Sequence, residues 1–316
     1  MSPRALRRLL LTLAVVASPG AMLAACGSRT PLLVPDAVDA EAGLDVRPDR
    51  QRDTGPDTQL PGLDATPLDA NRNDCPDADA TLIYVVTNTR QLLSFNPPAA
   101  SFKLIGTLAC PAPIGANPFS MGVDRKGVAY VLYQDNGGGF GGLFKVGTGT
   151  LACSATPFTQ TAIFDTFGMG FATIGAGPAE ELFIIANDGN VGKIDVSSYK
   201  VTNVGLTNPA ITWAELTGTG DGRLYAFFTN DNGPGTGIAE VDKSNAKIVG
   251  QNLMPTLDRG TAWAFAFWGG DFYTFTEAGG GSQVHRYRPA DKSLTLVATY
   301  GAPIVGAGVS TCAPSQ

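Results

Sequence analysis

Residues 238–250 read I-A-E-V-D-K-S-N-A-K-I-V-G, which is two short stretches of alternating polarity joined by a polar turn. The same hairpin pattern occurs four more times, starting at Leu92, Leu143, Val191 and Val284. One apolar anchor holds the same place in every copy, and the anchors recur at intervals of 51, 48, 47 and 46 residues: Phe95, Val146, Ile194, Val241 and Tyr287. A period of about 40 to 50 residues built from short strands is typical of β-propeller blades, so the sequence predicts an all-β propeller.

Two further strands are expected in each copy. A strand with a central aromatic residue precedes each hairpin, at Tyr84, Tyr130, Phe183, Tyr225 and Tyr273. Before four of these lies another alternating strand, which begins at Phe119, Phe167, Trp213 or Trp263. The first copy lacks this strand, and the C-terminal stretch from Ile304 has its pattern. We therefore expect five four-stranded blades in residues 81–316, with the C-terminal strand completing the first blade and removing the open sheet edge.

The repeats resemble those of YVTN, NHL and quinoprotein-like propellers. Y-V-V-T-N at residues 84–88 and G-D-G-R-L-Y-A at residues 220–226 are similar to the strand openings of that group. V-G-K-I-D and I-A-E-V-D are similar to the strand that follows. The resemblance covers about three quarters of the chain and implies a fold rather than a chemistry, because such propellers serve as enzymes, lectins and scaffolds.

The N-terminus has the pattern of a secretory signal. Arg4, Arg7 and Arg8 precede an apolar run over residues 9–17 that is too short to span a bilayer, and L-A-A-C follows at residues 23–26. This resembles the lipobox of bacterial lipoproteins, which implies cleavage after residue 25 and acylation of Cys26. Gly27 after the cysteine implies sorting to the outer membrane of the cell envelope. The alternative is an ordinary signal peptide in which Cys26 is incidental.

Residues 26–80 are expected to be a disordered tether. Gly27 to Ala80 contains 12 acidic and 5 basic residues and almost no aromatic ones, so it cannot bury enough apolar surface to offset the entropy of ordering. Removing both this segment (−7) and the signal (+3) from the net charge of −6 leaves −2 on the propeller region, which is nearly neutral. A nearly neutral domain without a stripe of basic residues argues against binding to nucleic acid. Acyl chains on Cys26 would instead attach the protein to a membrane.

The cysteine count suits an oxidising compartment. If Cys26 carries lipid, four cysteines remain, and three pairings of them are possible. We favour Cys75 with Cys312, because ring closure brings the C-terminal strand beside the first strand of the domain. Cys110 then pairs with Cys153, if the outer strands of neighbouring blades come close enough.

Few residues suggest catalysis. His285 is the only histidine, which excludes a multi-histidine metal site, and no cofactor motif is present. Glu215 lies in an innermost strand where its expected counterparts are Met121, Met169 and Phe265, so its carboxylate should lie near the central channel. It either hydrogen-bonds loop amides there or contacts a ligand together with Asp258 and Arg259. Too few axial carboxylates are expected for a glycosidase.

Two other groups of residues have a structural and a functional interpretation. Trp213 and Trp263 are expected to pack between blades, but an exposed tryptophan would suggest a platform for a sugar or a peptide. The Asn/Asp-Gly turns at residues 135–137, 187–189 and 230–233 are expected to be tight hairpins, with calcium binding as the alternative.

Together these patterns favour a non-enzymatic, lipid-anchored propeller of the bacterial cell envelope that binds an envelope protein. A carbohydrate-binding propeller is the first alternative, and a propeller hydrolase or lactonase is the second.

Overall fold

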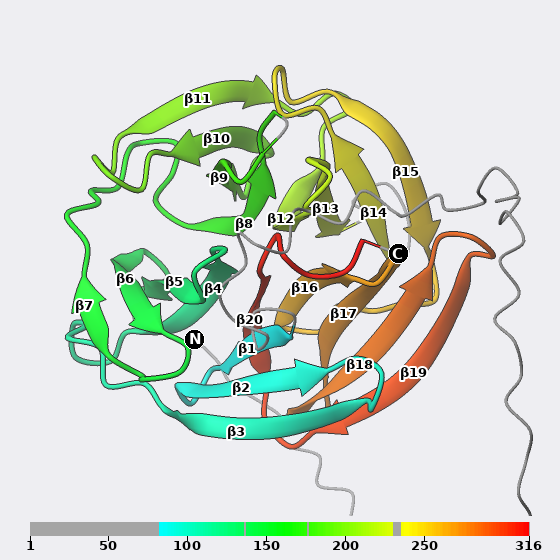
Figure 1. The fold of residues 1–316 in the computed structure, drawn as a ribbon, viewed down its shortest axis with the longest axis horizontal. Coiled ribbons are helices and arrows are strands. Elements are labelled where there is room, and N and C mark those ends of the chain that lie inside the picture. Colours follow the sequence, from blue (N-terminus) through cyan, green and yellow to red (C-terminus); the bar gives the residue numbers. More distant parts are fainter. Residues whose placement is uncertain (1–81, 136, 176, 230–234, 316) are drawn as a thin grey trace, which may run out of the picture. The chain divides into compact units, whose positions relative to one another are not determined.

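A computed structural model describes residues 82–135, 137–175, 177–229 and 235–315. The expected signal peptide, the tether, Cys26 and Cys75 lie outside these residues, so their assignments stay predictions. The described residues form an all-β propeller of five four-stranded antiparallel sheets (Figure 1). Within this part of the chain we find no helix with the length and apolarity that a membrane crossing requires.

Every blade runs from an innermost strand at the axis to an outermost strand at the rim. Blade 1 is β20 (Ile304–Val309), β1 (Ile83–Thr87), β2 (Gln91–Asn96) and β3 (Ser101–Thr107). Blade 2 is β4 (Asn117–Val123), β5 (Val128–Gln134), β6 (Phe140–Gly147) and β7 (Cys153–Ala155). Blade 3 is β8 (Phe167–Thr173), β9 (Glu180–Ala186), β10 (Asn190–Ile194) and β11 (Val201–Leu206). Blade 4 is β12 (Thr212–Gly218), β13 (Leu224–Thr229), β14 (Thr236–Val241) and β15 (Ile248–Met254). Blade 5 is β16 (Trp263–Trp268), β17 (Asp271–Ala278), β18 (Gly281–Arg288) and β19 (Ser293–Tyr300).

Ring closure by the C-terminal strand is confirmed. β20 pairs antiparallel with β1, with Tyr84 opposite Gly308 and Ile83 opposite Val309.

The chain just after β20 is also hydrogen-bonded to other blades, because the Thr311 hydroxyl donates to Glu180 Oε2 at 2.8 Å. The other oxygen of that carboxylate accepts the Arg125 backbone N–H at 2.7 Å. Burial raises the pKa of Glu180 to about 7, so this link from the C-terminus to blades 2 and 3 contains a carboxyl that titrates near neutrality.

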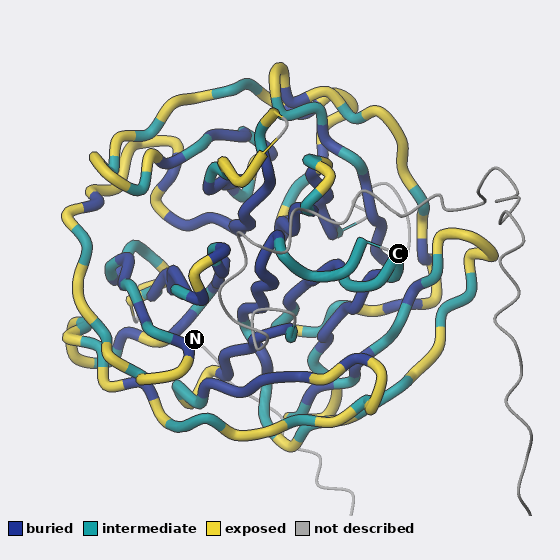
Figure 2. Tube along the Cα trace, in the orientation of Figure 1, coloured by how far each residue is buried: buried dark blue, intermediate teal, exposed yellow. Residues whose placement is uncertain are grey.

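Each wedge between two neighbouring blades holds one hydrophobic cluster. The five repeat anchors are all buried in these clusters, which explains their spacing: Phe95, Val146, Ile194, Val241 and Tyr287. Burial is therefore greatest toward the axis, whereas the outer strands carry most of the exposed residues (Figure 2). Removing apolar side chains from water at about 25 cal/mol per Å² makes these wedges the main source of stability.

Small residues in the innermost strands allow the blades to converge. A Cβ atom on Gly168 in β8 would lie 2.8 Å from Glu215 Cα and would clash with the Ala214 backbone of the next blade. A Cβ atom on Gly306 in β20 would lie 2.9 Å from the Met121 backbone nitrogen. These positions need glycine because two backbones approach closely there.

The expected register of β12 is wrong by one residue. The pairing of β12 with β13 shifts between Thr212 and Glu215, and Trp213 in this bulge has a φ of 51°. Downstream of the bulge Thr217 lies opposite Tyr225, just as Gly170 lies opposite Phe183 in blade 3. Glu215 lies two residues before Thr217, just as Gly168 lies two residues before Gly170. The counterparts of Glu215 in the other blades are therefore the small residues Gly168, Ser120 and Ala264. They are not Met121, Met169 and Phe265. An inserted residue turns every side chain upstream of it to the other face.

The Cys110–Cys153 disulfide is confirmed. Cys110 follows β3, Cys153 begins β7, and their Cα atoms are 5.1 Å apart. The bridge is possible because the outer strands run along the circumference of the ring, so the end of one blade reaches the edge of the next (Figure 1). Cys312 is also disulfide-bonded, while its predicted partner, Cys75, lies outside the described residues.

Candidate functional site

Glu215 lies at the axis of the ring and joins three blades. The Ser120 hydroxyl of β4 donates to Glu215 Oε2 of β12 at 2.7 Å, and the same hydroxyl accepts the Met169 N–H of β8 at 3.2 Å. Only 4% of Glu215 is exposed, and this burial raises the pKa of its carboxyl well above the ordinary 4.5. Hydrogen-bonded in this way, the carboxyl of Glu215 links the innermost strands of three blades, and it is not presented on the surface with Asp258 and Arg259.

The predicted tryptophans lie at the end of the ring where the innermost strands begin, which we call the top face. Trp213 and Trp263 lie near the starts of β12 and β16 in neighbouring blades. The guanidinium carbon of Arg259 lies 4.0 Å from the centroid of the Trp263 ring. Such a cation–π contact stabilises both side chains and fixes the position of the charge. The structure thus brings two of the predicted residues together.

Trp213 itself is 44% exposed. The bulge removes it from the interblade wedge, where Ala214 takes its place, and leaves the indole ring on the surface. A positive φ at a residue with a large side chain costs about 1–3 kcal/mol. The strain is held in part by the hydrogen bond from the Trp213 N–H to the Asn187 carbonyl oxygen at 3.1 Å. Such strain is a reason to test this residue for a functional role.

Two exposed isoleucines on the top face were not predicted. Ile114 is fully exposed, at 102% of its reference area, in the loop 108–116 between blades 1 and 2. Ile163 is 41% exposed in the loop 156–166 between blades 2 and 3. With Trp213, they place one apolar side chain near each of three consecutive connections between blades. The sequence signal was a lone isoleucine in each polar or proline-rich loop, but exposure cannot be read from one such residue.

Asp258 lines a cavity of about 550 Å³ at the top end of blade 5, and the lining of this cavity includes neither Trp213 nor the two isoleucines. Its carboxylate accepts the Gly260 N–H at 3.0 Å. Glu277 and His285 line the same cavity. The Gly280 N–H donates to the Glu277 carboxylate and lowers its pKa, while partial burial lowers the pKa of His285 below 6.5. The cavity therefore brings together the carboxyl groups of Asp258 and Glu277 and the imidazole of His285.

The described Asp turns use their carboxylates internally. Asp135 Oδ1 accepts the N–H groups of Gly137 and Gly139 at 2.8 and 2.9 Å, and Asp188 Oδ1 accepts that of Asn190 at 3.0 Å. In the part of the chain with described positions, no three His, Cys, Asp or Glu residues form a group that could hold a metal ion. The turns at Asp135 and Asp188 therefore match the tight-hairpin interpretation, whereas residues 230–233 lie outside the described residues.

No protein-family model matches this chain, and no curated protein does so either. Among solved structures, a chain from a crystal structure of a nidogen/laminin complex is 11% identical with a TM-score of 0.45, and the match covers 72% of this chain and 97% of that one. A chain from a crystal structure of the mitotic checkpoint complex is 13% identical with a TM-score of 0.37, covering 68% of this chain and 62% of that one. Likenesses this distant carry no information about a ligand or an activity.

Proposed function

We propose that this protein is a lipoprotein of the bacterial cell envelope, anchored in the outer membrane through acylated Cys26. Its propeller acts as a non-enzymatic module that binds an envelope protein through the top face. The anchor is supported by the order of arginines, apolar run, small residues and cysteine at the N-terminus. Two or three acyl chains, each contributing about 0.8 kcal/mol per buried methylene, suffice for stable attachment.

The observation that carries the binding proposal is the exposure of Trp213 on a strained bulge. Tryptophan and arginine are enriched among the residues that contribute most to protein interfaces. Trp213 has Trp263 and Arg259 at the start of the neighbouring blade, and Ile163 and Ile114 extend the same face over two further blades. The carboxyl of Glu215 at the axis is buried and accepts a hydrogen bond from Ser120. This arrangement favours a binding role for the protein over a catalytic one.

Photo-crosslinking in intact cells tests the binding face. A photoreactive amino acid at position 163 should give a discrete protein adduct, and Trp213→Ala in the same chain should remove it without changing the thermal unfolding midpoint. The matched control places the photoreactive residue at position 249, because Val249 is an exposed apolar residue near the start of outer strand β15, at the end of the ring opposite the top face. No adduct at position 163, or the same adduct from both positions, would show that the top face is not the binding surface.

The anchor is tested separately. Cys26→Ser should abolish incorporation of an alkynyl fatty acid and release the protein from the membrane fraction. A serine variant that still takes up the label would disprove acylation at this residue, whatever the outcome at the top face.

A further inference from the structure

The seam between blades 4 and 5 contains three cavities in series. One of about 430 Å³ lies toward the end of the ring opposite the top face, one of about 320 Å³ lies midway, and the Asp258 cavity lies at the top. The first two share Gln251 and Asn252 in their linings, and the last two share Thr256 and Leu294. Shared walls make them one groove along the seam, which we call the seam groove.

Three aromatic residues form the floor of its lower end. The rings of Tyr225 and Phe272 contact edge to face at 4.8 Å between centroids, and those of Phe267 and Phe272 do so at 5.2 Å. Tyr225 comes from blade 4 and the two phenylalanines from blade 5. All three are largely buried and support one another, so this floor is formed before any ligand arrives.

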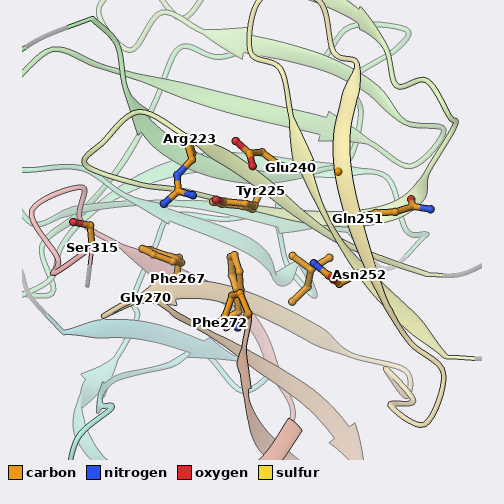
Figure 3. Close-up of a pocket in the computed structure, with 12 residues that line it drawn as sticks. Arg223, Tyr225, Glu240, Gln251, Asn252, Phe267, Gly270, Phe272 and Ser315 are labelled. Carbon is orange, nitrogen blue, oxygen red and sulfur yellow. The ribbon is translucent and has the colours of Figure 1, made fainter. Parts of the chain in front are cut away.

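Polar side chains lie around this floor. Figure 3 shows Arg223 and Glu240 on the blade 4 side of Tyr225 and Asn252 beside Phe272, whereas the Gln251 side chain points away. The Arg223 guanidinium lies 5.5 Å from the Tyr225 ring centroid and is held by Asp221 at 3.0 Å. Within the described residues, the side chains of Glu240 and Asn252 form no hydrogen bond, so both are available to a ligand.

The remainder of the groove is polar and has mixed charge. Lys292 lines the middle cavity, and Asp258 and Glu277 line the top one. Gln283 and Thr276 add groups there that both donate and accept hydrogen bonds. A polycation would be repelled by Asp258 and Glu277, and a polyanion would be repelled by these two residues' end of the groove but attracted by Lys292, so neither fits the whole groove. An extended peptide would need several empty apolar pockets for its side chains, whereas the aromatic residues of this seam already pack against one another.

We propose that the seam groove binds a linear, largely uncharged oligosaccharide. The first sugar occupies the cavity of about 430 Å³ that Tyr225 and Phe272 help to line, and its hydroxyl groups bond to Glu240 and Asn252. Hydroxyl groups donate and accept, which suits a lining that offers carboxylate, amide and guanidinium groups together. The following sugars extend toward Gln283 and Asp258. Glu240 and Asn252 lie toward the end of the ring opposite the top face, so a test at these two residues is independent of the protein-binding proposal.

Glycan-array binding of the purified full chain tests the proposal, followed by saturation-transfer NMR with cellotetraose, maltotetraose and chitotetraose. We expect at least one neutral linear oligosaccharide to bind saturably. Glu240→Ala combined with Asn252→Ala should weaken that binding about tenfold or more. The matched control is Asn203→Ala, which removes an exposed asparagine from outer strand β11. Trp213→Ala should leave sugar binding unchanged.

Three results would overturn the proposal. The first is the absence of binding to every neutral linear glycan at millimolar concentration. The second is sugar binding that the double variant does not weaken, since another surface would then be responsible. The third is saturable binding of an unstructured tetrapeptide at the same residues without sugar binding, which would identify the groove as a peptide site. Circular dichroism of the variants keeps a loss of folding apart from a loss of contacts.

Discussion

The disulfide between Cys110 and Cys153 should contribute substantially to stability, because it closes a long stretch of chain between two blades. The two cysteines are 43 residues apart. On the loop-entropy account, a bridge over that distance reduces the entropy of the unfolded chain by an amount equivalent to about 4 kcal/mol at 25 °C. For a domain of this size each kcal/mol corresponds to roughly 2–4 °C in Tm. Replacing both cysteines with alanine should therefore lower Tm by roughly 8–16 °C.

The assay is thermal unfolding followed by circular dichroism without reductant, on the full chain and on the Cys110→Ala/Cys153→Ala variant. Both residues are changed together, so that no free thiol is left to exchange with the disulfide of Cys312. Ser154→Ala serves as control, because Ser154 is an exposed neighbour of Cys153 in the same short strand. A double variant whose Tm lies within about 2 °C of the parent would refute the reasoning that this bridge restricts the unfolded chain.

The ring itself leads to three further predictions. Because burial raises the pKa of Glu215 above 4.5, the folded state binds the extra proton, and stability should fall by up to about 1.4 kcal/mol per pH unit as pH rises above 4.5. Glu215→Gln should flatten this dependence in urea titrations at pH 5 and 7, and equal slopes in both proteins would contradict a protonated carboxyl. Deleting residues 304–316 removes β20, exposes the edge of β1 and should cause aggregation in size-exclusion chromatography; a monomeric product with the parent's Tm would argue against closure. Limited proteolysis should trim the segment before residue 82 and leave a resistant propeller, and equally rapid cleavage within residues 82–315 would contradict that boundary.

The blade architecture could be predicted from the sequence because each strand depends on a pattern of neighbouring residues. Alternation of apolar and polar residues specifies a strand over a few residues, and the anchors from Phe95 to Tyr287 repeat that specification once per blade. The first repeat lacks an innermost strand, and the C-terminal stretch from Ile304 has the pattern of one. These two observations were enough to predict the pairing of β20 with β1.

The candidate site depended on contacts that no local pattern encodes. One extra residue in β12 exposed Trp213, and the regular register after it directs Glu215 toward Ser120, a residue 95 positions away in the chain. Whether a strand absorbs such a residue as a bulge is decided by packing against the neighbouring blade, not by its own alternation. The seam groove likewise exists only because β15 and β18 of different blades leave space between them. The sequence by itself determined the blades and how the ring closes, whereas the tertiary structure alone decided which side chains reach the surface, because exposure depends on what packs against each residue from distant parts of the chain.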